Sequence, residues 1–434
     1  MNKLTPLKSL PAILVLLSIG LLFSCKKNTD TDPVVTYTSP YVGQIFNAGD
    51  NVNVVAHVAA NQNLQFVKLS LLNSNYVAVN NITSFSVSGS SLDINQNITL
   101  DNSLATGTYY ITINAYDGTR MTNAYQQIYV HGIPLVRKAI SVVTGSNFQN
   151  TKVYKIDTNN VATNIISLNG DFASSAISSK DQCLYTTGIF SGDFNNIDLN
   201  AETINWSINN PGTGLPFYEN VYYANGLTYL SLFSQTIKGY DKSKNVNFTA
   251  NTSTNTYPHI VFNNGSYVFA EQRNISSYDV RLKVYYAQSG AGFQEFVINQ
   301  DVAGMYSYDA NDIILFMNNN GNGSVLIYNI NNNTTTQPIV LPAGKIYSVL
   351  QITPTYYLLA YQNQVYYYST ANVGHTGTYQ SIPASQAMQF DSLNNEVFIA
   401  NATHLDIYDY TSSSLINTIT LPDSIKDIRI LYNK

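Results

Sequence analysis

The side chains best suited to recognising a ligand in this chain are aromatic and charged residues that stand between apolar, strand-like segments. They are Phe148, Phe190, Phe217, Tyr218, Tyr257, His259, Glu271 and Arg273. Flat aromatic faces beside hydrogen-bonding and charged groups suit sugars or peptide segments. Packing of its own loop explains any one of these rings better than ligand binding does, so only a set gathered on one face predicts a binding patch.

Catalytic motifs are missing from the sequence. The five histidines, His57, His131, His259, His375 and His404, lie in different segments without the spacing of a zinc site. No nucleophile elbow, Walker loop or dinucleotide fingerprint occurs. Asp171, Asp193 and Asp301 could meet around a cation, but turn capping explains each of them better. We therefore predict no catalytic residues, no metal and no cofactor.

A repeated pattern positions these candidate residues. Seven apolar and aromatic alternations end in a small turn-forming residue and are spaced 40 to 46 residues apart: Asp157, Asp198, Asp241, Ala287, Asn329, Ser369 and Asp409. Short alternating strands with polar turns at this period are typical of one four-stranded propeller blade. The pattern predicts seven blades between residues 133 and 434.

The second repeat shows the expected strands of one blade. They are 173–178 (innermost), 182–187, 195–199 and 203–208, and later repeats place innermost strands at 220–224, 259–262, 305–309, 347–352 and 387–391. The first repeat begins at its second strand, 138–143, while the strand 426–433 is left over after the seventh. We predict that this last strand supplies the missing inner strand and closes the ring, which removes exposed strand edges.

The repeats resemble seven-bladed bacterial propellers of the YVTN and WD-type superfamily, in architecture rather than in those signature strings. The resemblance implies a ligand face built from the loops that join second to third strands and one blade to the next. These loops contain the eight candidate residues named above, so they are expected along one rim.

The N-terminus reads as an export signal. Lys3 and Lys8 precede an apolar run, 12–23, that is too short to span a membrane comfortably, and Cys25 follows directly. Residues 22–25 (LFSC) resemble the lipobox of bacterial lipoproteins, which implies a signal peptide over 1–24, lipidation of Cys25 and anchoring in the outer membrane, on either its periplasmic or its outer side. With Cys25 acylated, Cys183 has no disulfide partner and is expected to be a small buried residue.

Residues 25–33 are polar and form a tether, after which 34–132 is all-β without the 42-residue period. Alternating runs at 48–58 and 66–72 and a hairpin over 107–130, broken at Asp117–Gly118, predict a sandwich. The AGDNVNVVAHV and GTYYITINAYDG stretches resemble bacterial immunoglobulin-like domains. The expected fold is thus all-β: an immunoglobulin-like sandwich followed by a seven-bladed propeller.

Composition limits the partners. Only 11% of the 434 residues are charged, the net charge is −5, and 34 are tyrosines. A chain without a basic stripe is not expected to bind nucleic acid. We predict a lipid-anchored envelope protein that binds a glycan, a peptide or a protein without catalysis. The alternatives are a propeller enzyme acting on polysaccharide, as a lyase or hydrolase, and a structural subunit of an envelope complex.

Overall fold

The computed structural model describes residues 31–146, 150–336, 339–341, 344–361, 363–371, 375–382, 385 and 387–434. Cys25 and the signal segment lie outside these residues, and so does Phe148. The chain separates into two compact units, one ending at Pro134 and the other spanning Leu135–Lys434. Among the described residues, no helix is long and apolar enough to cross a membrane.

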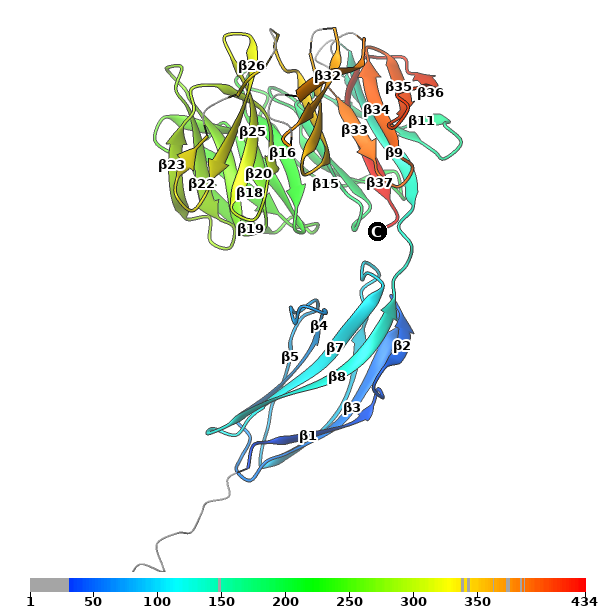
Figure 1. Ribbon diagram of the computed structural model, residues 1–434, viewed down its shortest axis with the longest axis vertical. Helices are drawn as coiled ribbons and strands as arrows, with labels where there is room; N and C mark the ends of the chain where they lie inside the picture. Colours follow the sequence, from blue (N-terminus) through cyan, green and yellow to red (C-terminus); the bar gives the residue numbers. More distant parts are fainter. Residues whose placement is uncertain are drawn as a thin grey trace, which may run out of the picture. The chain divides into compact units, whose positions relative to one another are not determined.

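Two sheets with a shared hydrophobic core form the first unit (Figure 1). One sheet has the order β1 (Val34–Ser39), β3 (Asn51–Ala59), β6 (Ser91–Thr99). The other has the order β2 (Gln44–Asn47), β8 (Met121–His131), β7 (Gly107–Tyr116), β4 (Phe66–Leu72), β5 (Thr83–Phe85), with β2 parallel to β8. Strict alternation along β3 buries Val52, Val54 and Val58 and exposes their neighbours, as a two-layer β structure requires.

The predicted hairpin between β7 and β8 is confirmed. Tyr116 pairs with Met121 at the end of the ladder. The Asp117 carboxylate accepts hydrogen bonds from the backbone N–H groups of Thr119 (2.9 Å) and Arg120 (2.7 Å), and Gly118 takes a positive φ of 93°. This is the turn chemistry for which aspartate and glycine are suited.

Within its described residues, the second unit contains seven sheets of antiparallel strands (Figure 1). The first sheet contains β37 (Ile425–Tyr432), β9 (Arg137–Ser146), β10 (Asn150–Ile156) and β11 (Ala162–Asn169). The second contains β12 (Ser174–Ser178), β13 (Cys183–Thr187), β14 (Phe194–Asp198) and β15 (Thr203–Ile208). The third contains β16 (Tyr218–Ala224), β17 (Leu227–Leu232), β18 (Thr236–Tyr240) and β19 (Val246–Asn251).

The remaining four sheets repeat this plan. The fourth contains β20 (Thr256–Asn263), β21 (Tyr267–Asn274), β22 (Val280–Tyr286) and β23 (Gly292–Val297). The fifth contains β24 (Asp301–Ser307), β25 (Asp312–Asn319) and β26 (Asn322–Asn329), whose far edge pairs with two short strands, β27 (Thr334–Thr335) and β28 (Ile339–Val340). The sixth contains β29 (Ser348–Thr353), β30 (Tyr356–Ala360), β31 (Val365–Ser369) and β32 (His375–Gln380). The seventh contains β33 (Met388–Asp391), β34 (Glu396–Asn401), β35 (His404–Asp409) and β36 (Leu415–Thr420).

The sheets are arranged in a β-propeller-like manner. Their innermost strands contact one another in a closed series: β12 with β16, β16 with β20, β20 with β24, β24 with β29, β29 with β33, β33 with β37 and β37 with β12. A separate hydrophobic cluster lies between each pair of neighbouring sheets. The cores of this unit are therefore interfaces between sheets, each buried by two neighbours.

The pairing of the last strand with the first repeat is confirmed. Strand β37 runs antiparallel to β9 from Ile425 opposite Thr144 to Tyr432 opposite Arg137. The Arg137 guanidinium forms ion pairs with Asp391 (2.7 Å) and Glu396 of the seventh sheet. The first and seventh sheets are thereby joined by a hydrophobic cluster and by these ion pairs.

Cys183 is buried in β13, as the sequence predicts. Its thiol lies 3.2 Å from the Asp181 carbonyl oxygen. Burial raises the pKa of the Cys183 thiol to about 11, with help from the charges of Asp198 and Asp181. A thiol held protonated in this way is a poor nucleophile, which fits a packing role.

Candidate functional site

One end of the second to fifth sheets carries most of the predicted ligand-binding residues; we call it the rim. At this end each first strand begins and each second strand ends. The rim residues are Phe190, Phe217, Tyr257, His259, Arg273 and Asp301. Tyr257 and His259 stand on β20, and Arg273 stands on β21 directly opposite Tyr257. Tyr257 and Arg273 are therefore fixed by a strand ladder, while His259 lies at a register shift of β20. The sequence predicted a loop for Arg273 and Glu271.

Contacts link the rim from sheet to sheet. The Phe217 N–H donates to the Ile189 carbonyl (2.9 Å), and the Phe233 N–H donates to the Phe217 carbonyl (3.0 Å). The rings of Phe233 and Tyr257 lie 4.6 Å apart between centroids. The structure thus brings Phe217 and Tyr257 together through Phe233, although 40 residues separate them in the chain.

A buried carboxylate anchors the charged part of the rim. Glu271 is fully buried, and its Oε1 accepts from Arg273 Nε (2.9 Å) and lies 2.9 Å from Arg273 Nη2. Asp301 Oδ1 lies 3.5 Å from the same Nη2. Burial opposes the charged form of Arg273, but the two carboxylates outweigh it and raise the pKa of the guanidinium. Arg273 is therefore a fixed cation whose charge is already balanced by the carboxylates of Glu271 and Asp301.

A second side-chain pair, His259 with Glu219, lies beside it. His259 Nδ1 is 3.1 Å from Glu219 Oε2, and the His259 side chain is 29% exposed. Burial raises the pKa of the nearby Tyr257 hydroxyl, and the negative charge of Glu219 raises it further. Tyr257 therefore stays a neutral hydroxyl that can donate or accept a hydrogen bond.

Two predicted residues cannot touch a ligand at the rim surface. Tyr218 is completely buried, and its hydroxyl donates to the carbonyls of Ile208 (3.1 Å) and Asn209 (3.2 Å). Glu271 is also completely buried, and its Oε2 has no hydrogen-bond partner among the described residues. Both were placed on the ligand face by sequence position, but each points into the packing between sheets and supports the rim from beneath.

Phe190 is 41% exposed and stands on a loop held by a single carboxylate. The Asp171 carboxylate accepts from the N–H groups of Ile189, Phe190, Ser191 and Gly192, at 2.8 to 3.2 Å. Burial alone would raise the pKa of Asp171, but these N–H donors outweigh it and lower that pKa. The capping role expected for Asp171 is confirmed, and among the described residues no group of three acidic, histidine or cysteine side chains could hold a metal ion.

The loop carrying Phe190 also depends on two glycines. A Cβ on Gly188 would lie 2.3 Å from the Asp171 carbonyl oxygen, and one on Gly192 would lie 2.2 Å from it. Neither contact is sterically allowed, so no larger residue fits while the loop wraps the aspartate.

Sequence reasoning missed the most exposed groups of the rim. Tyr278 is 66% exposed, and its pKa is raised by burial and by the nearby charge of Asp301. Leu215 and Ile275 are also exposed. All three lie in polar loops, where no periodic pattern marks them, so their only sequence signal is an apolar or aromatic residue among turn formers.

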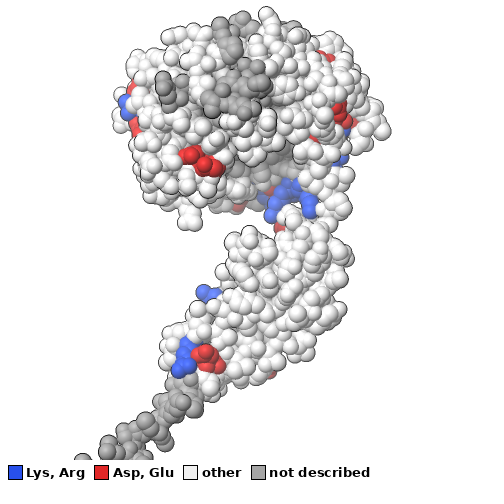
Figure 2. Space-filling model, viewed as in Figure 1, with Lys and Arg blue, Asp and Glu red and all other residues white. Residues whose placement is uncertain are grey.

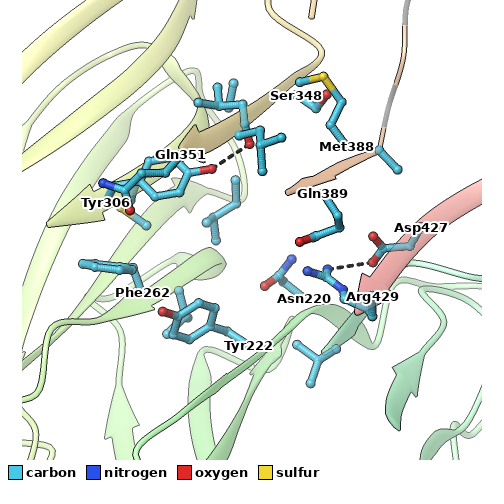
Figure 3. A pocket seen from close by; sticks show the side chains of 18 residues that line it. Asn220, Tyr222, Phe262, Tyr306, Ser348, Gln351, Met388, Gln389, Asp427 and Arg429 are labelled. Carbon is cyan, nitrogen blue, oxygen red and sulfur yellow. Dashed lines mark hydrogen bonds and ion pairs between the residues drawn. The ribbon is translucent and has the colours of Figure 1, made fainter. Parts of the chain in front are cut away.

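A cavity lies where the innermost strands meet, and we call it the axial cavity (Figure 3). It has a volume of about 480 Å³ and is lined by residues of β16, β20, β24, β29, β33 and β37 together with Ala387. One wall carries Tyr222, Phe262 and Tyr306, and the other carries Asn220, Gln389 and Arg429 (Figure 3). None of the eight predicted residues lines it.

The axial cavity could have been detected in the sequence. Its polar residues interrupt otherwise apolar inner strands, as in the segments AMQFD around Gln389 and KDIRILYN around Arg429. A polar group in the middle of an innermost strand either faces the axis or is buried between sheets, and burial without a hydrogen bond lowers stability. Beside the cavity β24 and β29 approach closely, since a Cβ on Gly304 would lie 3.1 Å from Val349 Cβ.

Charge is sparse on the molecular face that Figure 2 shows, where uncharged groups dominate both units. At the rim the charges are paired, and in the axial cavity Arg429 and Asp427 are the only charged lining residues among those described. Neither place brings an activated nucleophile together with a general base. The chemistry on offer is hydrogen bonding and aromatic contact.

Comparisons with known proteins identify no family. No protein-family model matches the chain, and no curated protein matches it significantly. Among solved structures, hydrazine synthase from Kuenenia stuttgartiensis is similar with 12% identity and a TM-score of 0.48, over 63% of this chain and 90% of that one. The computationally designed Ika8 protein is similar with 12% identity and a TM-score of 0.46, over 67% and 90%. Similarity at this level carries no conclusion about function.

Proposed function

We propose that this protein is a lipid-anchored envelope protein that binds a ligand without catalysis on the rim of a seven-bladed β-propeller. In this proposal an immunoglobulin-like domain acts as the spacer between the membrane anchor and the propeller. The seven consecutive sheets, the closed series of inner-strand contacts and the β37–β9 pairing support the propeller. Two sheets over one core support the spacer domain.

The observation that carries the proposal is the continuous rim. Exposed Phe190 and Tyr278 flank a row of fixed groups that includes Tyr257 and Arg273. Because Arg273 and His259 already have carboxylate partners, a ligand does not have to supply a negative charge to balance them. Among glycan, peptide and protein ligands, a neutral glycan therefore fits best, with its sugar faces on the rings and its hydroxyls on the polar groups.

The test is a glycan array followed by titration of the best neutral oligosaccharide. The double variant Phe190→Ala, Tyr278→Ala removes two exposed rings and is expected to weaken binding by about tenfold, since each ring contact contributes about 0.5–1.5 kcal/mol. Tyr356→Ala is the matched control, because Tyr356 is 43% exposed at the hairpin between β29 and β30, the opposite end of its sheet.

Unchanged affinity in the double variant, or an equal loss in the control, would contradict the proposed rim site. Oligosaccharide products appearing during the incubation would favour the enzyme instead. If the array gives no ligand, a pull-down from envelope extracts with the same variants tests a peptide or protein ligand.

The anchor is tested separately at Cys25. The Cys25→Ala variant is expected to lose incorporation of a labelled fatty acid and to leave the membrane fraction. Lys26→Ala keeps the acylated thiol and serves as the control for processing. A membrane-bound, lipid-labelled Cys25→Ala product would disprove the anchor.

A further inference from the structure

The axial cavity contains polar side chains that no protein group satisfies. Among the described residues, the amide groups of Asn220 and Gln389 have no hydrogen-bond partner, although both side chains are half-buried. They come from the third and seventh sheets and converge with the Arg429 guanidinium of the first (Figure 3). Half-buried polar groups without a protein partner remain available for hydrogen bonds, so a convergent set of them suits the polar end of a ligand.

Arg429 is held with one nitrogen left open. Its Nη2 donates to Asp427 Oδ2 at 2.7 Å, and its Nε donates to the Ser175 hydroxyl at 3.3 Å. Its Nη1 has no partner among the residues that the structure describes. Two contacts therefore fix the plane of the guanidinium while its free end faces Asn220 and Gln389 (Figure 3).

The negative charge of Asp427 is shared among several donors. Besides Arg429, its carboxylate accepts from the Ser175 hydroxyl (2.8 Å), the Ser175 N–H (3.2 Å) and the Ile428 N–H (2.8 Å). These donors occupy lone pairs of the Asp427 carboxylate, which reaches only Nη2 of Arg429 and leaves Nη1 for another acceptor. The positive charge of Arg429 acts on the facing wall as well. It opposes the rise that burial causes in the pKa of the Tyr222 and Tyr306 hydroxyls.

The facing wall is apolar and aromatic. The rings of Tyr222 and Phe262 lie 5.9 Å apart, and the Tyr306 hydroxyl is occupied by the Val349 carbonyl at 2.6 Å. Met305, Val349 and Leu350 complete this wall. A ligand here would place a charged or polar end on Arg429 and an apolar body against the rings, in a volume within the range of small-molecule sites.

We propose that the axial cavity binds a small organic acid, with its carboxylate on Arg429, Asn220 and Gln389 and its apolar body against Tyr222 and Phe262. A planar carboxylate matches the free guanidinium end, and the amide N–H groups donate to its remaining lone pairs. This site is independent of the rim, with which it shares no residue.

The probe is 3-phenylpropanoate, titrated by calorimetry and by ligand-observed nuclear magnetic resonance against the full chain. Its matched controls are 3-phenylpropan-1-ol and 3-phenylpropan-1-amine, which keep the phenyl group and the chain and replace the carboxylate with a hydroxyl or an amine. The acid is expected to bind at least about tenfold more tightly than the alcohol, because a hydrogen bond to a charged group adds about 1.5–3 kcal/mol. The amine is expected to bind least.

Variants assign the site. Arg429→Gln is expected to abolish the preference for the acid, and Arg429→Lys to retain part of it. Asp427→Asn removes the competing carboxylate and is expected to tighten acid binding severalfold, a gain that unfolding could not produce. The rim variant Tyr278→Ala is expected to leave acid binding unchanged, which separates this proposal from the glycan proposal.

Equal affinities for acid and alcohol would overturn the proposal. An acid preference that survives in a folded Arg429→Gln variant would overturn it as well. So would a failure to detect binding of 3-phenylpropanoate, and of hexanoate as a second acid, at millimolar concentration. Folding of each variant is checked by circular dichroism and thermal melting.

Discussion

The rim and the axial cavity are built from the same ring of sheets, yet they treat polar groups in opposite ways. At the rim, Arg273 and His259 each have a carboxylate partner. In the axial cavity Arg429 also has a carboxylate partner, Asp427, but the amides of Asn220 and Gln389 have no hydrogen-bond partner among the described residues. The charged groups at the rim are thus paired within the protein, whereas two amides in the cavity are not paired within the described residues.

This difference separates groups that hold the fold from groups that are available to a ligand. Removing a partnered charge strands its counterpart and is expected to cost stability. Removing an unpartnered amide strands nothing and is expected to cost only ligand affinity. Stability and binding measurements on the same variants therefore tell the two kinds of group apart.

The largest effect is expected from deleting residues 426–434. This removes most of β37 and with it the buried Ile428, Ile430 and Leu431, each worth about 1.5–3 kcal/mol of burial. It also exposes the edge of β9 and takes Arg429 from the cavity. We expect the second unit to melt lower by more than about 10 °C and to aggregate, measured by calorimetry and light scattering. Lys426→Ala, which changes an exposed residue of the same strand, is the control. A deletion variant that melts within a degree or two of the parent would disprove the closed ring.

A smaller loss is expected from Glu271→Gln at the rim. Breaking a buried ion pair costs about 3–5 kcal/mol, and because Arg273 keeps Asp301 we expect a loss of roughly 2 kcal/mol here. The matched change in the cavity, Arg429→Gln, leaves Asp427 with its Ser175 and Ile428 donors and is expected to cost less than about 1 kcal/mol. Chemical denaturation compares the two. Equal losses would mean that the cavity charge is structural.

Acid should weaken the fourth sheet through Glu295. Burial alone would raise the pKa of Glu295, but hydrogen bonds from Lys283, Ser253 and Arg281 outweigh it and lower that pKa to about 2, from an ordinary value of 4.5. A depressed carboxyl pKa adds stability that is complete above pH 4.5 and is lost as the pH falls towards 2. Melting temperatures between pH 6 and 2 should fall less steeply in Glu295→Gln. A slope equal to that of the parent would refute the assignment, and Glu202→Gln, at an exposed pair with Lys155, is the control.

The smallest effects on stability are expected from Asn220→Ala and Gln389→Ala. Because neither amide has a protein partner among the described residues, the free energy of unfolding should change by no more than about 0.5 kcal/mol. Equilibrium denaturation measures this directly. A loss above about 1 kcal/mol in either variant would show that the amide supports the fold and would remove it from the proposed ligand set.

Most of the ring could be predicted because its pattern is local and repeated. The strands expected at 203–208 and 426–433 agree with β15 and β37 to within a residue. Three inner strands begin earlier than predicted, β16 at Tyr218, β20 at Thr256 and β24 at Asp301. Pro258 in β20 and Gly304 in β24 interrupt the apolar alternation on which the prediction depends.

The site was harder to predict because burial is a tertiary property. Tyr218 and Glu271 have the residue types of a ligand site, but neighbouring sheets cover both. Tyr278 looked like one more loop residue and is the most exposed ring of the rim. The axial cavity depends on side chains of six sheets, so no single segment reveals it, although polar residues within inner strands such as Gln389 give a usable signal.

The pairing of β37 with β9 also has a kinetic consequence. Leu431 lies opposite Ala139, so the contact closes a loop of nearly the whole second unit. Contacts between such distant segments form late, because the chain entropy of closing the loop is lost before the contact is gained. We therefore expect Arg429 to reach the cavity late in folding, after the sheets between have formed. Binding of a small acid would then indicate that folding is complete. A chain in which β37 has not yet paired with β9 would have the sheets of the rim but would not bind the acid in the axial cavity.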